Sequence, residues 1–262
     1  MKRSLKRVFA CTCILAFVAA VTQLEAKVTE EEAKKLRDGT LMPTGGEAKG
    51  NADGTIPPWE GGITEIPQGY KGGNYIDPFA EDKILFTITA ANVAEYADKL
   101  SPGQIATFKR YPNTYKMNVY PTRRSASYPQ RIYDWAVKNA TTAELVEGGN
   151  GFRNARESIP FPIPKEGVEA VWNHLTRYRN DTVYRVYAVI APTPGGAYTV
   201  VTTEEKIFFP YSVEGATSET INNRLIYFLS NTLAPPRMAW GMPLVHETID
   251  QVKERRQAWT CN

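Results

Sequence analysis

The two histidines of the chain, His174 and His246, are the side chains best suited to catalysis or metal binding. His246 begins "HETID", which matches half of the zinc pattern H-E-x-x-H, but Asp250 stands where the second histidine is needed. Gly241 and Pro243 favour a strand, on which residues four apart do not converge as they do on a helix. His174 has no serine or cysteine nucleophile in a sharp turn nearby. We therefore expect neither a metal site nor a catalytic residue.

Adjacent carboxylates at Glu204 and Glu205 suggest a second chemistry, that of an envelope hydrolase with an acid pair. Both residues lie in a stretch rich in Val, Thr, Ile and Phe, which favours a β-strand. Successive side chains of a strand point to opposite faces, so these two carboxylates cannot share a substrate. The sequence therefore ranks a hydrolase last.

The first 26 residues have the parts of a secretory signal peptide. An apolar run of 14 residues, 8–21, precedes Leu24-Glu25-Ala26 and follows four basic residues, Lys2, Arg3, Lys6 and Arg7. The run is shorter than the ~20 residues that span a bilayer, and no later stretch of that length lacks charge. We expect cleavage after Ala26, with residues 27–262 forming a single soluble domain in the periplasm and no transmembrane segment remaining.

The charge balance argues against nucleic acid as a partner. Removal of residues 1–26 leaves 31 − 4 = 27 basic and 28 − 1 = 27 acidic residues, so the net charge of the remaining chain is zero. No basic patch stands out in what remains.

The positions of the cysteines limit which disulfides and lipid attachments the exported chain can have. Cys11 and Cys13 lie within the expected signal peptide, so Cys261 alone remains and no intrachain disulfide can form. Neither early cysteine lies at the cleavage point, so we expect no lipid anchor. Nothing in the sequence indicates a cofactor.

In the N-terminal half, helices are predicted before and after an irregular segment. Thr29 and Glu32 have capping-box spacing before a helix that ends at Gly39, and Ser101 and Gln104 repeat this signal. Further helices are expected at 89–100, 101–111 and 129–145.

The Gly/Pro-rich stretch 42–78 is predicted to be an irregular surface segment held down by Trp59 and Tyr70. Its aromatic residues suggest stacking on sugars as an alternative, together with those at Tyr111, Tyr115, Tyr120 and Tyr128. Nothing places several of these rings on one plane, so tethering of the chain is favoured over carbohydrate binding.

After Asp181 the apolar pattern changes to a period of two, which predicts strands. The strands are expected at 182–190, 197–209 and 224–233, with the turn "PTPGG" after the first. Short connections favour an antiparallel meander. The run "RLIYFLS" has no polar face, which suggests a sheet covered on both sides. The fold class is therefore α+β.

The stretch "FPIPKEGVEAVWNH" is predicted to be a rigid lead-in to a packing helix, because Pro162 and Pro164 restrict the backbone before it. At 100° per residue, five apolar side chains fall on one face of this helix: Val168, Val171, Trp172, Leu175 and Tyr178. His174 lies at the margin of that face.

Six stretches together resemble a bacterial periplasmic family of unknown function that is described as outer-membrane lipoprotein-sorting-like. They are "GNADGTIPPWEGGI", "LFTITAANVAEYADKLSPGQ", "YPTRRSASYPQRIYD", "GGNGF", "FPIPKEGVEAVWNHLTRYR" and "LVHETIDQVKERRQAW". The resemblance implies a LolA/LolB-like fold, an incomplete and curved antiparallel half-barrel whose concave face takes acyl chains beneath helices. Family members continue beyond "RQAW", so the sequence is expected to be truncated at its C-terminus, which would expose a sheet edge.

The resemblance implies a carrier rather than an enzyme, and three functions follow in order. The first is non-catalytic binding of a lipid or other hydrophobic molecule linked to outer-membrane assembly or transport. The second is an adaptor for an outer-membrane barrel or an exporter, with 42–78 as its contact surface, and the third is the hydrolase. Alternate strand residues supply the expected lining of a hydrophobic cavity: Tyr184, Val186, Ile207, Phe209, Ile226 and Phe228.

Overall fold

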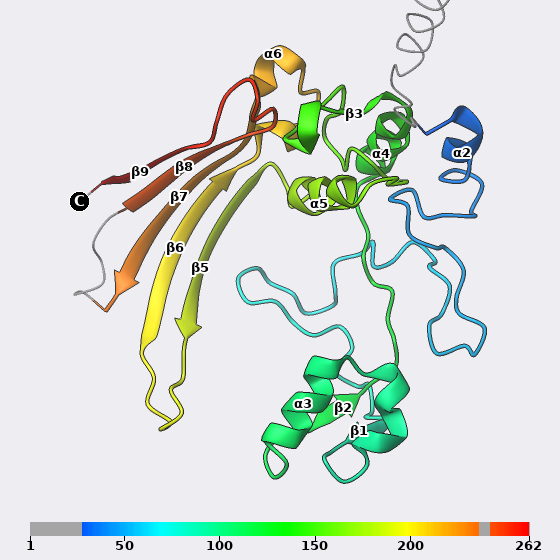
Figure 1. Cartoon of the computed structure of the whole chain (residues 1–262), viewed down its shortest axis with the longest axis vertical. Helices are drawn as coiled ribbons and strands as arrows, with labels where there is room; N and C mark the ends of the chain where they lie inside the picture. Colours follow the sequence, from blue (N-terminus) through cyan, green and yellow to red (C-terminus); the bar gives the residue numbers. More distant parts are fainter. Residues whose placement is uncertain (1–27, 236–241, 262) are drawn as a thin grey trace, which may run out of the picture. The chain divides into compact units, whose positions relative to one another are not determined.

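The structure is a computed structural model that describes residues 28–235 and 242–261 (Figure 1). The expected signal peptide lies outside the described residues. The chain divides into two compact units. Lys34–Val137 forms the first, called here the small unit, and Lys138–Asn262 with the residues up to Ala33 forms the second, called the sheet unit.

The small unit is built from short elements joined by long irregular connections. In chain order these are β1 (Phe86–Ile88), the 3-10 helix η1 (Val93–Lys99), α3 (Pro102–Arg110), β2 (Met117–Val119) and the start of α4 (Gln130–Thr142). Strands β1 and β2 pair antiparallel. Ser101 and Gln104 form the predicted capping box of α3, whereas the helix expected at 89–100 is a 3-10 helix and α4 is shorter than expected.

The segment 42–78 contains no named helix or strand. Two side chains and the backbone bond from the Ile63 N–H to the Ser125 carbonyl at 2.9 Å attach it to the residues near 125. The indole N–H of Trp59 donates to the carbonyl of Ala126 at 3.0 Å, and its ring meets Tyr133 edge-on. Arg124, which the sequence analysis did not single out, donates to several backbone carbonyls of the segment. The ring of Tyr70 stacks on Tyr75 within the same segment. Trp59 and Arg124 therefore supply the side-chain attachment.

The sheet unit contains several helices and short strands, and all of them except α2 contribute to or lie beside an aromatic core. These elements are α2 (Glu30–Lys34), β3 (Glu144–Leu145), η2 (Glu147–Gly149), β4 (Phe152–Arg153), α5 (Gly167–Thr176), η3 (Pro210–Ser212) and α6 (Ser218–Ile221). Phe152 lies at the centre, where its ring meets Phe161, Trp172 and Tyr211 edge-on. Helix α2 has the predicted Thr29–Glu32 cap but ends at Lys34, before the expected end at Gly39.

Helix α5 buries a narrower stripe than its apolar pattern predicts. Trp172 and Thr176 are buried, and the Trp172 indole N–H donates to the carbonyl of Gly149 at 3.0 Å. Val171 and Leu175 are exposed, so the predicted arc is wrong at these two positions. The lead-in sets this rotation, because Asn173 exchanges two hydrogen bonds with the backbone of Phe161.

A five-stranded antiparallel sheet makes up the rest of the sheet unit, in the order β5-β6-β7-β8-β9 (Figure 1). The strands are β5 (Thr182–Ile190), β6 (Val200–Phe208), β7 (Arg224–Ala234), β8 (Met242–Thr248) and β9 (Gln257–Cys261). The predicted meander is confirmed and extends by two further strands. Among the described residues the sheet is not closed, and β5 and β9 are its edges.

Candidate binding face of the sheet

Strand register assigns every side chain of the sheet to one of two faces. Tyr184 pairs with Lys206 and Val186 with Glu204, while Arg185 pairs with Glu205 and Val183 with Ile207. Directly opposed residues of antiparallel strands share a face. We call one side the Tyr184 face, which carries Tyr184, Val186, Phe208, Tyr227, Leu229, Leu244, His246 and Trp259. The other is the Glu205 face, which carries Val183, Tyr187, Thr203, Glu205, Ile207, Phe228 and Val245.

Burial separates the two faces most clearly on β6, whereas on β7 and β8 both faces are partly buried and on β9 both are exposed. On the Glu205 face Ile207 is 8% exposed, whereas on the Tyr184 face Tyr184 is 62%, Val186 50%, Phe208 41% and Trp259 43% exposed. The expectation of a sheet covered on both sides is therefore wrong for the Tyr184 face at β5, β6 and β9, whereas the run "RLIYFLS" of β7, from which it was drawn, is buried or partly buried on both faces. Exposed apolar residues are ordinary when they are scattered, but a contiguous set marks a surface for binding.

Rings on the Tyr184 face form a row across four strands. Phe208 stacks on Tyr227 with centroids 6.2 Å apart and planes 12° from parallel. Tyr227 meets His246 edge-on at 4.6 Å, and His246 meets Trp259 edge-on at 4.8 Å. Such contacts restrain the rings against one another, so the face presents a preformed apolar strip rather than independent side chains.

A polar group lies beside this row near the β5 edge. The Tyr184 hydroxyl donates to Glu204 at 3.0 Å, and this bond with the adjacent negative charge raises the pKa of Tyr184. Lys206 lies 4.0 Å from the same carboxylate. The Tyr184 face therefore carries a row of rings over β7, β8 and β9, with Asn231 and Gln257 as polar neighbours on the same face, and a paired charge on β6 beside β5.

The Glu205 face is polar at its centre. Glu205 is buried and accepts hydrogen bonds from Arg185 at 2.5 Å and from the Tyr187 hydroxyl at 2.6 Å. The bond to Glu205 raises the pKa of Tyr187. As expected from strand alternation, Glu204 and Glu205 lie on opposite faces. This arrangement compensates a buried carboxylate and leaves no free acid pair.

The six residues expected to line one cavity lie on both faces. Ile207 and Phe228 are paired on the Glu205 face, with Ile226 two residues along β7, and Phe209 is 4% exposed just beyond β6. Tyr184 and Val186 point to the opposite side, so the expectation of one common lining is corrected.

The turn between β5 and β6 explains why the six expected residues lie on two faces of the sheet. It closes on a hydrogen bond from the Thr193 N–H to the Ala197 carbonyl, and the resulting register pairs even residues of β5 with even residues of β6. A change of one residue in the expected register moves a whole set of side chains to the other face.

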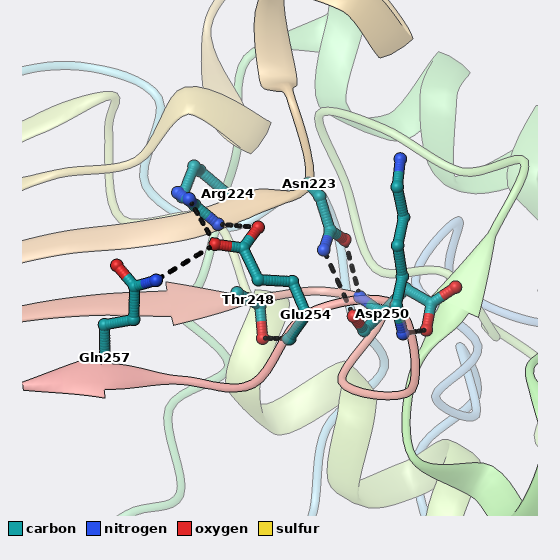
Figure 2. A network of polar contacts seen from close by, with 7 residues as sticks. Asn223, Arg224, Thr248, Asp250, Glu254 and Gln257 are labelled. Carbon is teal, nitrogen blue, oxygen red and sulfur yellow. Dashed lines mark hydrogen bonds and ion pairs between the residues drawn. The ribbon is translucent and has the colours of Figure 1, made fainter.

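A polar network anchors the strands that carry the row of rings (Figure 2). Arg224 binds both carboxylate oxygens of Glu254 at 2.7 Å, and Gln257 donates to the same carboxylate at 3.3 Å. The bond between Arg224 and Glu254 holds the pKa of Glu254 below its usual range and raises the pKa of Arg224. The Thr248 hydroxyl donates to the Glu254 carbonyl at 2.8 Å. The start of β7 is thereby tied to the turn between β8 and β9.

A second part of the network joins β7 to the end of β8. The Asn223 amide donates to the Asp250 carbonyl at 3.1 Å and accepts from the Asp250 N–H at 2.7 Å. Asp250 in turn accepts from the N–H groups of Val252 and Lys253 at 3.0 Å. Asp250, which stands where the zinc pattern needs its second histidine, therefore caps a turn.

Other candidate sites from the sequence find no support in the described ranges. No group of three or more His, Cys, Asp or Glu side chains could hold a metal ion there. His246 lies on a strand, as predicted, and His174 is exposed on α5. A search of the same residues for a helix long and apolar enough to cross a membrane found none.

Several residues of the Tyr184 face were missed by sequence reasoning. Phe208, Tyr227, Leu244 and Trp259 were not singled out, although "MPLVHET" and "QAWTC" alternate in the way that strands do. Carrying the period of two through these two stretches finds Leu244 and Trp259. Phe208 and Tyr227 lie in strands that were predicted, and only the register places them on this face.

The fold and this face define an α+β protein with an open antiparallel sheet that presents a row of partly exposed rings on one side. The chain belongs to a family of proteins of unknown function, DUF1329, whose model matches residues 87–262. Over 253 residues it is 46% identical to an uncharacterized protein of Pseudomonas aeruginosa, PA3922, an alignment that covers 96% of this chain and 55% of that protein. The chain thus spans about half the length of this curated relative. No solved structure matches it significantly.

Proposed function

We propose that this chain binds a lipid or another hydrophobic molecule on the Tyr184 face without a chemical step. The observation that carries the proposal is the contiguous row of partly exposed rings from Phe208 to Trp259, beside the exposed Tyr184 and Val186. Every Å² of apolar surface removed from water contributes roughly 25 cal/mol. A flexible acyl chain lying along such a row would cover several side chains at once, which favours an elongated ligand.

The setting of this function is also proposed. Periplasmic location rests on the signal-peptide pattern of residues 1–26, and a LolA/LolB-like carrier fold rests on the sequence resemblance together with an open antiparallel sheet. In that setting a lipid-binding sheet face suits transport or assembly at the outer membrane. The ligand-contacting set is revised to the Tyr184 face, which keeps Tyr184 and Val186 from the six expected residues.

Neighbouring residues of β9 provide a matched test. Trp259 lies on the Tyr184 face and Ala258 on the Glu205 face, and both are exposed. Trp259→Glu and Ala258→Glu therefore add the same charge to the same strand on opposite sides of the sheet. Binding of a fluorescent long-chain fatty acid should weaken at least tenfold in Trp259→Glu and stay within twofold of wild type in Ala258→Glu. Equal weakening in both variants, or no binding by wild type, contradicts the proposal.

A protein adaptor is the second candidate, because the segment 42–78 exposes apolar side chains of its own. Ile66 and Tyr75 are among the most exposed apolar residues of the described chain. Native mass spectrometry of protein taken from the periplasm separates the two candidates. A bound lipid supports the carrier, and a stoichiometric bound protein that is lost in an Ile66→Ser, Tyr75→Ser variant supports the adaptor.

A further inference from the structure

The outer edge of β5 is long, exposed and unprotected. Seven of its nine residues are exposed, and all nine pair with β6 without a register shift, whereas the β6–β7 and β7–β8 ladders each contain one. Edge strands are usually protected by Pro, Lys, bulges or short length. Strand β5 contains no Pro or Lys, and its single charge, Arg185, is bonded to Glu205.

Hydrogen bonds at the two ends of the β5–β6 ladder show which backbone groups point outward. The Phe209 N–H donates to the Asp181 carbonyl at 2.7 Å, and the Thr193 N–H donates to the Ala197 carbonyl at 2.8 Å. Hydrogen-bonded and non-hydrogen-bonded pairs alternate along an antiparallel ladder. The odd residues of β5 therefore bond to β6, and the N–H and C=O groups of Tyr184, Val186 and Ala188 face away from the sheet.

From this geometry we infer that β5 pairs antiparallel with β5 of a second copy of this chain, with Val186 of one copy opposite Val186 of the other. The register is self-complementary. Tyr184 then lies opposite Ala188, and Arg185 lies opposite Tyr187 on the Glu205 face. No like charges lie directly opposite each other, and the two Arg185 side chains are diagonal neighbours that are each paired with Glu205 of their own chain. Within one chain the Arg185 guanidinium already lies 5.0 Å from the Tyr187 ring centroid, which shows that these two side chains are compatible neighbours.

This pairing has a structural consequence for the binding face. A continuous ladder brings the Tyr184 faces of both copies to the same side of one sheet, because paired residues share a face. The inference does not depend on the proposed lipid binding, since it concerns backbone groups at the edge and is tested by association alone.

The test uses the backbone N–H of Val186, which the β5–β6 ladder does not need. Val186→Pro removes this outward donor, and Val186→Thr keeps both the donor and the branched side chain. Edge pairing buries less than the ~1,600 Å² of a standard interface, so we expect dimers at about 100 µM protein in analytical ultracentrifugation. Wild type and Val186→Thr should dimerise, and Val186→Pro should be monomeric. A monomeric wild type, or a Val186→Pro variant that dimerises as wild type does, overturns the inference.

Two oppositely charged variants test the register. They also keep the inference testable if Val186→Pro fails to fold. Val186→Lys and Val186→Glu each place like charges opposite each other in this symmetric register, so each alone should be monomeric. An equimolar mixture should form the heterodimer. Failure of the mixture to associate, when circular dichroism shows both variants folded, overturns the proposed register.

Discussion

Arg224 and Glu254 form a bidentate pair, with each carboxylate oxygen of Glu254 2.7 Å from a guanidinium nitrogen (Figure 2). The pair joins the start of β7 to the turn before β9. Trp259 lies on β9. Paired hydrogen bonds of this kind also impose direction, which a lysine cannot reproduce. Beyond its ladder with β8, the position of β9 therefore depends in part on this side-chain pair.

Loss of this pair should destabilise the sheet in a pH-dependent way. The pKa of Glu254 is lowered in the folded chain, mainly by its bond to Arg224. Its contribution is thus present above the ordinary carboxyl pKa and is lost as pH falls through the lowered value. Glu254→Gln should lower the unfolding midpoint in urea at pH 7, and the difference from wild type should shrink as pH falls below about 4. A difference that is constant from pH 7 to pH 3 would show that the charge is not involved.

The same pH range should reveal a second pair, between Lys165 and Glu32. The Lys165 ammonium bonds to this carboxylate and lowers the pKa of Glu32 to about 2. Since the ordinary value is 4.5, the stabilising contribution of the pair is complete above that value and disappears between 4.5 and about 2. NMR titration of the Glu32 side chain should give a midpoint well below 4.5 in wild type, and a higher one in Lys165→Met. An unchanged midpoint in that variant contradicts the assignment.

The sequence predicts elements better than it predicts faces. Local signals sufficed for the Ser101–Gln104 capping box and for β5, because caps and strand periodicity depend on neighbouring residues. The faces depend on register, and nothing near Val186 in sequence shows that it pairs with Glu204 rather than with Glu205. Likewise, the rotation of α5 that exposes Val171 depends on bonds from Asn173 to a segment outside the helix.

The buried amide of Asn139 should be indispensable to the loop that precedes α5. Its Nδ2 donates to three carbonyls, and its Oδ1 accepts from the Arg156 N–H at 3.3 Å. The three acceptors, 3.0–3.3 Å away, are the carbonyls of Arg156, Ser158 and Ile159. Asn139→Ala removes the amide from all of these groups. The Ser158 and Arg156 carbonyls keep their bonds from the Tyr211 hydroxyl and the Ser158 N–H, and each buried group that is left without a partner costs about 1–3 kcal/mol. Urea unfolding should show a loss of several kcal/mol. A loss below about 1 kcal/mol would mean that water replaces the amide.

Ser158 provides the opposite case within the same loop. Its hydroxyl is buried and makes no hydrogen bond, although its backbone carbonyl accepts from the Tyr211 hydroxyl at 2.6 Å. Removing an unpaired buried polar group relieves a desolvation cost. Ser158→Ala should therefore raise the free energy of unfolding or leave it unchanged, whereas Asn139→Ala lowers it. Destabilisation by Ser158→Ala would show that the hydroxyl has a partner in solution.

Arg124 should control the order of the segment 42–78. Its Nη2 donates to the Glu47 carbonyl at 2.6 Å, and its Nη1 donates to the Ala48 carbonyl at 3.0 Å. Nη1 also reaches the carbonyls of Lys49 and Pro57 at 3.3 and 3.4 Å. One guanidinium thus binds two stretches of an irregular chain, residues 47–49 and Pro57. Apart from the backbone bond from the Trp59 N–H to the Ala48 carbonyl at 2.8 Å, this guanidinium is the main link between them.

Replacement of this guanidinium should open the segment to proteolysis without unfolding the rest of the chain. In Arg124→Met, limited proteolysis should cut within residues 42–58 at least tenfold faster than in wild type, because cleavage follows local opening. The adjacent Arg123 supplies the control, since it bonds to Asp82 and lies over the ring of Phe79, so Arg123→Met removes the same charge without touching those carbonyls. Equal cleavage rates in the two variants would show that the loss of a positive charge or a general loosening of the fold exposes this segment. The hydrogen bonds from Arg124 to the backbone carbonyls would then not be the cause of its order.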